Sequence, residues 1–558
     1  MLRHTGWNSA NSPSVHTELT IELTAERTDT GSLTPWPQHR AKSVPVTLVI
    51  LFGVTLLSKA LGFLSQILVT SLLGTTGWAD TYHFAFSIVN IVSALVVGSA
   101  GFALIPLYIE KRERQGTARA NEFANVVLTY LTLVLVLLSL LMAILAGPLV
   151  IALGRFPAGL QPLATRVFAV TAPLAVLTGM GQLLMVLSQA RKRFVAPAFM
   201  GVLHSVVFMT VVAVAWNRLG VYSLVLGVAI SMLVQAVVML SRLAGEGRLS
   251  PSLRMPRTDL RHTLLLTGPL LLSQLLSTIQ VMTSRNIASG LVVGSVAALA
   301  YAESLKAVFL DLCVVPVAQI SLPLFAERLA RGETDSAWEQ LQGALAALWF
   351  LVTPVVVTLS VLSAPLVQLL YQRGAFTAQS TALTASALAF FSLGLLGESA
   401  HYLVSRYFLG LKDTRTLTSL GFPLTILYVV LLFLLSRVLS LEGIALGHSL
   451  VMIAHMATGL LLLRKKLNKR FARTFRRGLA KITVCGLAMW ITTRSTFVLL
   501  GTGMQDDFRS CLVVVSLSGL VGVGVYLAAS SWTGIAADIP LLCRLHPRRL
   551  LAELAARA

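Results

Sequence analysis

Charged residues are scarce in this chain. They make up 12% of its 558 residues, about half the share found in a typical soluble domain. Acidic residues are scarcer than basic ones, 23 against 44, which leaves a formal net charge of +21. Hydrophobic residues account for 56% of the chain, and they fall into runs of roughly 20 residues, the length that a helix needs to cross a bilayer. This composition excludes a soluble globular protein and predicts an all-α polytopic membrane protein.

Motifs for catalysis and for metal or cofactor binding are also missing. The four cysteines do not have the spacing of a metal site. There is no Walker A loop and no nucleophile elbow. The sequence therefore predicts neither an enzyme nor a metal site or cofactor. Nucleic acid is excluded as a partner, because the basic residues lie in short segments between apolar runs and not in a basic soluble domain.

The apolar runs predict about 14 transmembrane helices. Their approximate limits are 46–73, 80–107, 123–147, 162–189, 195–216, 220–241, 262–289, 294–325, 338–370, 379–409, 416–437, 442–463, 480–500 and 511–531. We expect two lobes of six helices each and two additional C-terminal helices. The corresponding divisions are a disordered cytoplasmic tail (1–44), an N-lobe (45–243), a cytoplasmic linker (244–261), a C-lobe (262–466), a C-terminal helix pair (467–532) and a second cytoplasmic tail (533–558).

The basic residues alternate between the connecting segments. They are dense at 111–119, 191–193, 242–257, 328–331, 412–415 and 464–477, and sparse in the segments between these. Short segments rich in Lys and Arg remain in the cytoplasm. The alternation therefore predicts that both termini are cytoplasmic.

Four ionisable residues interrupt the apolar stretch from Thr283 to Glu333: Arg285, Glu303, Lys306 and Asp311. Such a group at membrane depth costs about 2.5–3.5 kcal/mol and usually faces a polar cavity, a partner or a substrate. Glu303 and Lys306 are three residues apart on one helical face, so a neutral structural pair is the alternative to a role in binding. For Arg285 the alternative is an interfacial position. We predict that this stretch lines a polar cavity.

Other predicted spans contain polar candidates as well. Lys59 is near the middle of the first span, where we expect it to face a cavity. Asp80 opens the second span, and the alternative for it is a helix N-terminal acid favoured by the dipole; Asn90 follows in the same span. Glu398 and His401 are three apart in the tenth span. They could relay protons or bind a coupling ion, or they could form a structural hydrogen bond.

Several short motifs resemble those of a known family. The most specific is Arg373-Gly374-Ala375-Phe376-Thr377. The others include Ser58-Lys59-Ala60-Leu61-Gly62-Phe63, Ala79-Asp80, Asn90, Tyr301-Ala302-Glu303, Leu322-Pro323 and Asp413-Thr414. Over about residues 46–530, and in this order, the chain resembles the MurJ/MviN lipid II flippases of the multidrug/oligosaccharidyl-lipid/polysaccharide exporter superfamily.

This resemblance implies two six-helix lobes around a central cationic cavity in the bacterial inner membrane, with alternating access. It also implies a substrate in which a saccharide is joined to undecaprenyl pyrophosphate, moved from the inner to the outer leaflet. The family has arginine at the positions of Lys59, Ser65, Ser93 and Ser304 in this chain. The cationic set implied here is therefore smaller, and Lys306 lies two residues beyond the last of these positions.

Three hypotheses follow from the sequence. The first is a flippase for a lipid-linked saccharide, either lipid II or an exopolysaccharide unit, with glycosyltransferases or polymerases of the same pathway as possible partners. Its substrate-binding candidates are Lys59, Asp80, Asn90, Arg285, Glu303 and Lys306. The second is a cation-coupled multidrug antiporter of the same superfamily, and the third is a membrane scaffold for cell-wall synthesis.

Overall fold

The computed structural model describes residues 44–191, 193, 195–244, 250–253, 257–501 and 508–535. The described residues from Leu51 onward form one compact unit. The expected tail 1–44 lies outside the described residues except for Val44, as does 533–558 beyond residue 535. The linker 244–261 is described only in part.

The described residues contain helices and no strand. The helices before the linker are α1 (Val44–Leu73), α2 (Gly77–Ile144), α3 (Ala146–Leu153), α4 (Gln161–Thr171), α5 (Leu174–Ala190), α6 (Val195–Leu219) and α7 (Tyr222–Ala244). The helices after it are α8 (Arg257–Ser289), α9 (Ser295–Phe309), the π-helical turn η2 (Leu310–Val314), α10 (Val315–Ala330), α11 (Thr334–Val361), α12 (Ser363–Tyr371), α13 (Ala378–Leu393), α14 (Leu395–Gly410), α15 (Thr414–Leu467), α16 (Arg473–Gly501) and α17 (Phe508–Thr533). Residues 51–244 are called the first half below, and residues 257–535 the second half.

Two of these helices contain a break. In α2 the backbone leaves the helical region at Gly116, where φ is +87°, and in α15 it does so at Ser440, where φ is +50°. Each is therefore two helices joined end to end. The break at Ser440 falls between the spans predicted at 416–437 and 442–463, and the break at Gly116 falls in the basic segment 111–119.

Eleven helices in the described residues are long and apolar enough to cross a membrane, or 12 if the bent pair α13 and α14 is one span. One of the 11, Arg415–Leu467, contains the break at Ser440. The expected span 262–289, which falls in α8, is not among them. The prediction of an all-α polytopic membrane protein is confirmed, but the count of 14 is not.

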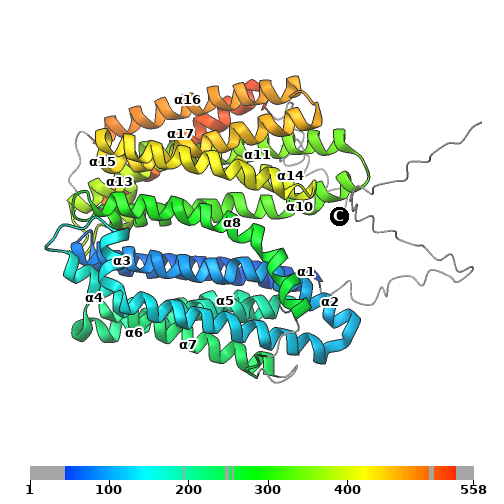
Figure 1. Ribbon diagram of the computed structural model, residues 1–558. Helices are drawn as coiled ribbons and strands as arrows, with labels where there is room; N and C mark the ends of the chain where they lie inside the picture. Colours follow the sequence, from blue (N-terminus) through cyan, green and yellow to red (C-terminus); the bar gives the residue numbers. More distant parts are fainter. Residues whose placement is uncertain are drawn as a thin grey trace, which may run out of the picture. The chain divides into compact units, whose positions relative to one another are not determined.

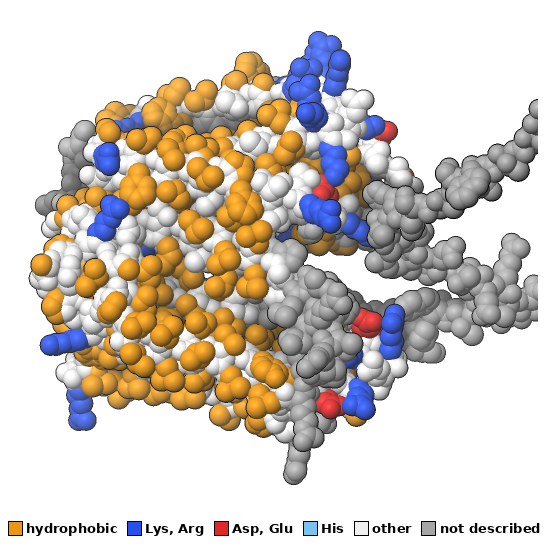
Figure 2. Space-filling model, viewed as in Figure 1, with side chains coloured by type: hydrophobic (Ala, Val, Ile, Leu, Met, Phe, Trp, Pro, Cys, Tyr) orange, Lys and Arg blue, Asp and Glu red, His pale blue; other side chains and the backbone are white. Residues whose placement is uncertain are grey.

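The surface agrees with a membrane location. Figure 2 shows hydrophobic side chains over the middle of the drawn face and charged side chains mainly towards its two ends. Large apolar residues are widely exposed, among them Leu137 at 67%, Val214 at 78% and Leu520 at 71%. A water-soluble monomer rarely exposes contiguous apolar surface on this scale. Lipid is the solvent that such a surface requires.

Helix packing is mostly local to each half. In the first half α2 packs on α4 and α5, and α6 packs on α7; α6 and α7 lie side by side in Figure 1. In the second half α13 packs on α9 and α15, while α14 packs on α10, α11 and α15. The C-terminal helices α16 and α17 pack on each other and on α11 and α12. The halves meet where α2 contacts α8 and α9.

Candidate functional site

The helix α9 and the turn η2 carry three ion pairs, and each pair joins a different helix. Glu303 pairs with Arg285 on α8, and Lys306 pairs with Glu398 on α14. Asp311, in the first turn of η2, pairs with Lys59 on α1. One short segment therefore connects two helices of its own half with a helix of the other half. Asp311 was noted as a charge in the sequence, but was not among the predicted site residues.

The alternative of a neutral pair between Glu303 and Lys306 is wrong, because each of them pairs with a residue of another helix. Residues three apart lie on one face of a helix, but the ends of long side chains can reach to either side of it. Here α8 supplies the arginine for Glu303 and α14 supplies the glutamate for Lys306. Because an ion pair between helices satisfies both charges and also fixes the packing, each side chain turns towards its neighbouring helix. Only 6% of the Arg285 side chain is exposed, so its guanidinium group lies inside the protein.

Lys306 makes a second contact beyond Glu398. Its Nζ lies 2.9 Å from Glu398 Oε2 and 3.1 Å from His448 Nε2. It also lies 5.3 Å from the centre of the Phe391 ring, within the range of a cation–π interaction. The side chains of Lys306 and Glu398 are 7% and 16% exposed. Lys306 is thus enclosed by one carboxylate, one imidazole and one aromatic face.

The pair of Lys59 and Asp311 is much more open. The two side chains are 49% and 36% exposed, although both residues fall within helices apolar enough to cross a membrane. The pair joins residues 252 apart in the sequence and links the two halves. Asp311 also lies in the first turn of a π-helix, a feature that often occurs at functional sites. A half-exposed ion pair at this position can exchange one partner for an incoming ion.

Two donor nitrogens of Arg285 have no hydrogen-bond partner among the described atoms. Its Nη2 donates to Glu303, while its Nε and Nη1 are buried and have no hydrogen-bond partner among the described atoms. A buried donor without an acceptor is unfavourable by about 1–3 kcal/mol. Arg285 is therefore able to donate hydrogen bonds to a further anionic or carbonyl oxygen while it keeps its bond to Glu303.

Asp80 holds the N-terminus of α9. Its two carboxylate oxygens accept from the backbone N–H of Gly294 at 2.6 Å and of Ala297 at 2.8 Å. Gly294 has φ +99° and supplies no side-chain cap of its own, so the cap comes from α2 in the other half. Asp80 therefore interacts favourably with the dipoles of two helices. One is its own helix α2, as expected from the sequence, and the other is α9, whose N-cap Gly294 lies 214 residues later in the chain.

Three other hydrogen-bond contacts join the two halves near the N-terminus of α9. The Ala375 backbone N–H donates to Ser71 O at 2.7 Å, the Tyr301 hydroxyl donates to Gly74 O at 2.9 Å, and the Thr75 and Ser380 hydroxyl oxygens are 2.8 Å apart. We call this end, where residues 71–80, 153–155, 286–297 and 373–380 meet, the Asp80 end. These contacts join the two halves at this end.

The motif residues Arg373 and Gly374 form a turn at the Asp80 end. Gly374 has φ +61°, and a Cβ at this residue would lie 2.3 Å from Ser71 O. Only glycine fits both the left-handed backbone and this close approach. Arg373 is exposed and donates to Leu369 O at 2.8 Å. The motif therefore shapes the contact between the halves.

The remaining predicted residues lie apart from the ion pairs. Asn90 is half-buried on α2 and takes no part in the hydrogen bonds that join the halves within the described residues. His401 lies beside His455, with ring centres 4.7 Å apart, and its Nε2 is 3.5 Å from Ser405 Oγ. His448 and His455 were missed by the sequence reasoning. Both fall in the apolar run 442–463, where ionisable residues are rare enough to be a signal.

Serines occupy positions at which the MurJ/MviN family has arginine, and two of them form hydrogen bonds within or between helices. Ser93 is buried and lies 2.7 Å from Thr178 Oγ1 and 3.1 Å from Ala175 O on α5. Ser65 donates to Leu61 O, one turn earlier on α1. These positions contribute no cation to the site.

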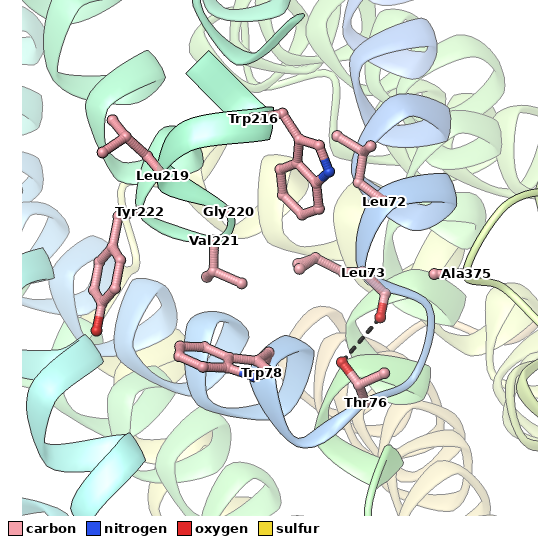
Figure 3. Close-up of a pocket in the computed structure, with 10 residues that line it drawn as sticks. All are labelled: Leu72, Leu73, Thr76, Trp78, Trp216, Leu219, Gly220, Val221, Tyr222 and Ala375. Atoms are coloured by element: carbon pink, nitrogen blue, oxygen red, sulfur yellow. Dashed lines mark hydrogen bonds between the residues drawn. The ribbon is translucent and has the colours of Figure 1, made fainter.

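A cavity of about 380 Å³ opens near the Asp80 end (Figure 3). Its lining residues are Leu72, Leu73, Thr76, Trp78, Trp216, Leu219, Gly220, Val221, Tyr222 and Ala375. None of them is basic, so the cavity offers no charge for an anion. Elsewhere in the described ranges, no group of three or more His, Cys, Asp or Glu residues could hold a metal ion.

The helical architecture, the membrane-length spans and the ion pair of Lys59 and Asp311 between two of them define an integral membrane protein of the transporter type. The family model described as "Lipid II flippase MurJ" matches residues 69–505. The chain belongs to this family, and it is a multi-pass protein of the inner membrane.

Relatives of similar length carry related descriptions. A Rhizobium tropici protein described as "Probable lipid II flippase MurJ" is 29% identical over 413 residues, covering 71% of this chain and 76% of its own. A Vibrio cholerae protein of the same description is 25% identical over 521 residues, covering 87% and 95%.

Solved structures show the same fold. One is "Lipid II flippase MurJ, inward closed conformation", with a TM-score of 0.74, 21% identity, and coverage of 88% of this chain and 99% of that one. A multidrug resistance MATE family transporter in an inward-facing conformation has a TM-score of 0.63 and 16% identity, covering 75% and 98%. At these identities the likeness concerns the fold alone.

Proposed function

We propose that this protein moves a polyprenyl-pyrophosphate-linked saccharide, lipid II or an exopolysaccharide unit, from the inner to the outer leaflet of the bacterial inner membrane. Membership of the flippase family supports this, and so does the fold. The observation that carries the proposal is the half-exposed pair of Lys59 and Asp311 within membrane-length helices. It is a cation between the halves whose present partner can leave.

The anionic headgroup takes the place of Asp311 in this proposal. In the empty carrier the Asp311 carboxylate neutralises Lys59, so the charge is not left alone at membrane depth. A pyrophosphate offers more negative charge and more acceptor oxygens than one carboxylate. It displaces Asp311 from Lys59, and the released end of η2 is free to shift. Lysine acts here as a point charge that tolerates several approach directions, unlike the fixed fork of arginine.

Arg285 contributes a second cation. Its buried Nε and Nη1 have no acceptor among the described atoms, and Glu303 on the same helix as Lys306 holds its third nitrogen. We assign Lys59 to the first contact with the headgroup and Arg285 to a later position along the path. Lys306 is already enclosed by Glu398, His448 and Phe391, so its part is to couple movements of α9 to α14 and α15.

The contacts at the Asp80 end suggest the state of the carrier. By the loop-charge alternation this end faces away from the cytoplasm, and both termini lie inside. With the halves joined there, access to Lys59 is from the cytoplasmic side, which is where the lipid-linked saccharide is loaded. Transport then requires the contacts of Asp80 to break while a contact forms at the other end.

The test is lipid translocation by the full-length protein in proteoliposomes, with fluorescent lipid II as the probe. We expect Lys59→Ala and Asp311→Lys to reduce the initial rate at least ~10-fold, because each leaves an unpaired charge or no cation. Lys59→Arg should retain activity. Lys465→Ala, which removes an exposed lysine outside this site, is the matched control. Equal rates in parent protein and Lys59→Ala would refute the proposal, and drug efflux without lipid transfer would favour the antiporter.

A further inference from the structure

Three histidines lie together in the second half, inside helices that otherwise bury apolar residues. His448 and His455 are on α15 and His401 is on α14, and all three are half-buried. The transport site described above does not need them. The titratable and charged groups around His448 are Lys306 and Glu303 on α9, Glu398 and His401 on α14, His455 and Tyr428 on α15, and Arg285 on α8.

The hydrogen-bond roles around Lys306 fix the protonation of His448. An ammonium group has three donors and no acceptor. Since Lys306 Nζ lies 3.1 Å from His448 Nε2, that nitrogen must accept, and the ring is neutral with its proton on Nδ1. Glu398 Oε2 accepts from the same ammonium at 2.9 Å. Lys306, Glu398 and His448 are therefore one cation, one anion and one neutral base.

A proton at His448 Nε2 cannot be accommodated in this arrangement. It would turn the acceptor into a donor and place a second positive charge about 3 Å from the ammonium, where repulsion is strong in a protein interior. The imidazolium has an alternative partner, because Glu398 Oε2 lies 3.9 Å away. When His448 is protonated, Glu398 therefore pairs with His448 in place of Lys306, and Lys306 is released.

We propose that His448 is a proton-binding site, and that a proton bound there releases Lys306 and so opens the Asp80 end. The proposal rests on the transport function above. The mechanical link is α9, which carries Lys306 near its C-terminus and has its N-terminus held by Asp80. Asp311 follows one turn later and holds Lys59. A shift of α9 thus changes both the closed end and the transport site.

His401 and His455 extend the group of imidazoles beyond His448. Their ring centres are 4.7 Å apart. His455 is two turns from His448 along α15, about 10 Å at 1.5 Å per residue, in the direction of the basic residues at its C-terminus. Ser405 lies next to His401 on the same side. The three imidazoles therefore lead from His448 towards the end of α15 that carries Arg464, Lys465 and Lys466.

The test measures opening of the Asp80 end without any lipid substrate. In a background with Cys313, Cys485, Cys511 and Cys543 replaced by alanine, Thr75→Cys with Ser380→Cys forms the Asp80-end reporter, since these two hydroxyls touch across the halves. Ser273→Cys with Thr418→Cys, within the second half and 3.3 Å apart, forms the control reporter. Disulfide yield is measured in proteoliposomes of the full-length chain with one fixed oxidant and only the buffer pH varied. Because only the thiolate reacts, the yield of the Asp80-end reporter is divided by that of the control reporter at each pH.

From about pH 8 to about pH 5.5, the range in which imidazoles titrate, we expect the yield of the Asp80-end reporter to fall at least ~3-fold. His448→Gln and His448→Asn should keep the high yield at both pH values. His204→Gln is the matched control: His204 is on α6, bonded to Ser231, and this variant should keep the parent's pH dependence. The control reporter shows the pH dependence of thiol ionisation alone, and it should be the same in the parent and in every variant.

A pH-dependent yield in His448→Gln equal to that of the parent would overturn the proposal. So would a parent yield that does not change with pH, or a loss of yield at pH 8 in both neutral variants, because a neutral residue should preserve the closed arrangement. The result is independent of lipid transport. A proton-responsive protein that fails to move lipid II would reject the proposed substrate but keep the proton site.

Discussion

Asp80 is the residue whose replacement should most directly release the contact between the halves. Its carboxylate accepts two backbone hydrogen bonds from the N-terminus of α9, at 2.6 and 2.8 Å, and it is 3% exposed. The bonds cross from one half to the other, so they exist only while the Asp80 end is closed. Asp80→Ala therefore destabilises the closed state relative to the open one, and leaves the open state nearly unchanged.

The magnitude follows from the two bonds. A hydrogen bond to a charged group contributes about 1.5–3 kcal/mol, so the loss of both amounts to about 3–6 kcal/mol. Because about 1.4 kcal/mol corresponds to a factor of ten, the ratio of closed to open carrier should fall ~100-fold or more. Asp80→Asn keeps one neutral acceptor and places an NH₂ group against the second backbone N–H. We expect it to show about half of the free-energy loss.

The assay is the initial rate of disulfide formation in the Asp80-end reporter at constant pH. The rate should fall strongly in Asp80→Ala and less in Asp80→Asn. Asp335→Ala removes an acid whose side chain is 79% exposed and paired with Lys469, and it should leave the rate unchanged. The control reporter tests that α8 and α15 remain packed. If Asp80→Ala cross-links within twofold of the parent while the control reporter is intact, the carboxylate does not hold the end closed.

Three further predictions concern other contacts. Lys306→Met should destabilise the protein by about 3–5 kcal/mol, because Glu398 is left as an unpaired buried charge, and Lys306→Met with Glu398→Met should recover most of this loss; thermal unfolding in detergent measures both. Gly374→Ala should weaken the closed Asp80 end by about 1–3 kcal/mol, since its φ is +61° and a Cβ would clash, and the Asp80-end reporter should form more slowly. Hydrogen bonds from Lys466 and Thr416 lower the pKa of Asp413 to about 2; the carboxylate therefore stays ionised above about pH 4, and its contribution is lost only as the pH falls towards 2. Asp413→Asn should accordingly leave the pH profile of the Asp80-end reporter between about pH 5.5 and 8 unchanged.

The sequence predicted the helices well because their signal is local. An apolar run of membrane length requires a helix in lipid, and the interruption between 416–437 and 442–463 coincides with the backbone break at Ser440. The stretch around Glu303 was also recognised as special from its charges alone. These predictions needed no knowledge of which helices are neighbours.

Contacts between residues of different helices could not be predicted in the same way. Helical periodicity places Glu303 and Lys306 on one face, but it does not say that α8 lies on one side of that face and α14 on the other. His448 is 50 residues from Glu398 and meets it only because α14 packs on α15. The cap that Asp80 provides crosses 214 residues. The π-helical turn at Asp311 likewise has no sequence signal that we could recognise.

Binding of the lipid-linked saccharide at Lys59 is the central claim, and native mass spectrometry of the full-length protein with added lipid II tests it most directly. The parent should retain the lipid, Lys59→Ala should bind it at least ~10-fold more weakly, and Lys465→Ala should bind it as the parent does. Asp311→Asn, which frees Lys59 from its carboxylate, should bind at least as tightly as the parent. Equal affinity in parent and Lys59→Ala, or weaker binding in Asp311→Asn, would contradict the account.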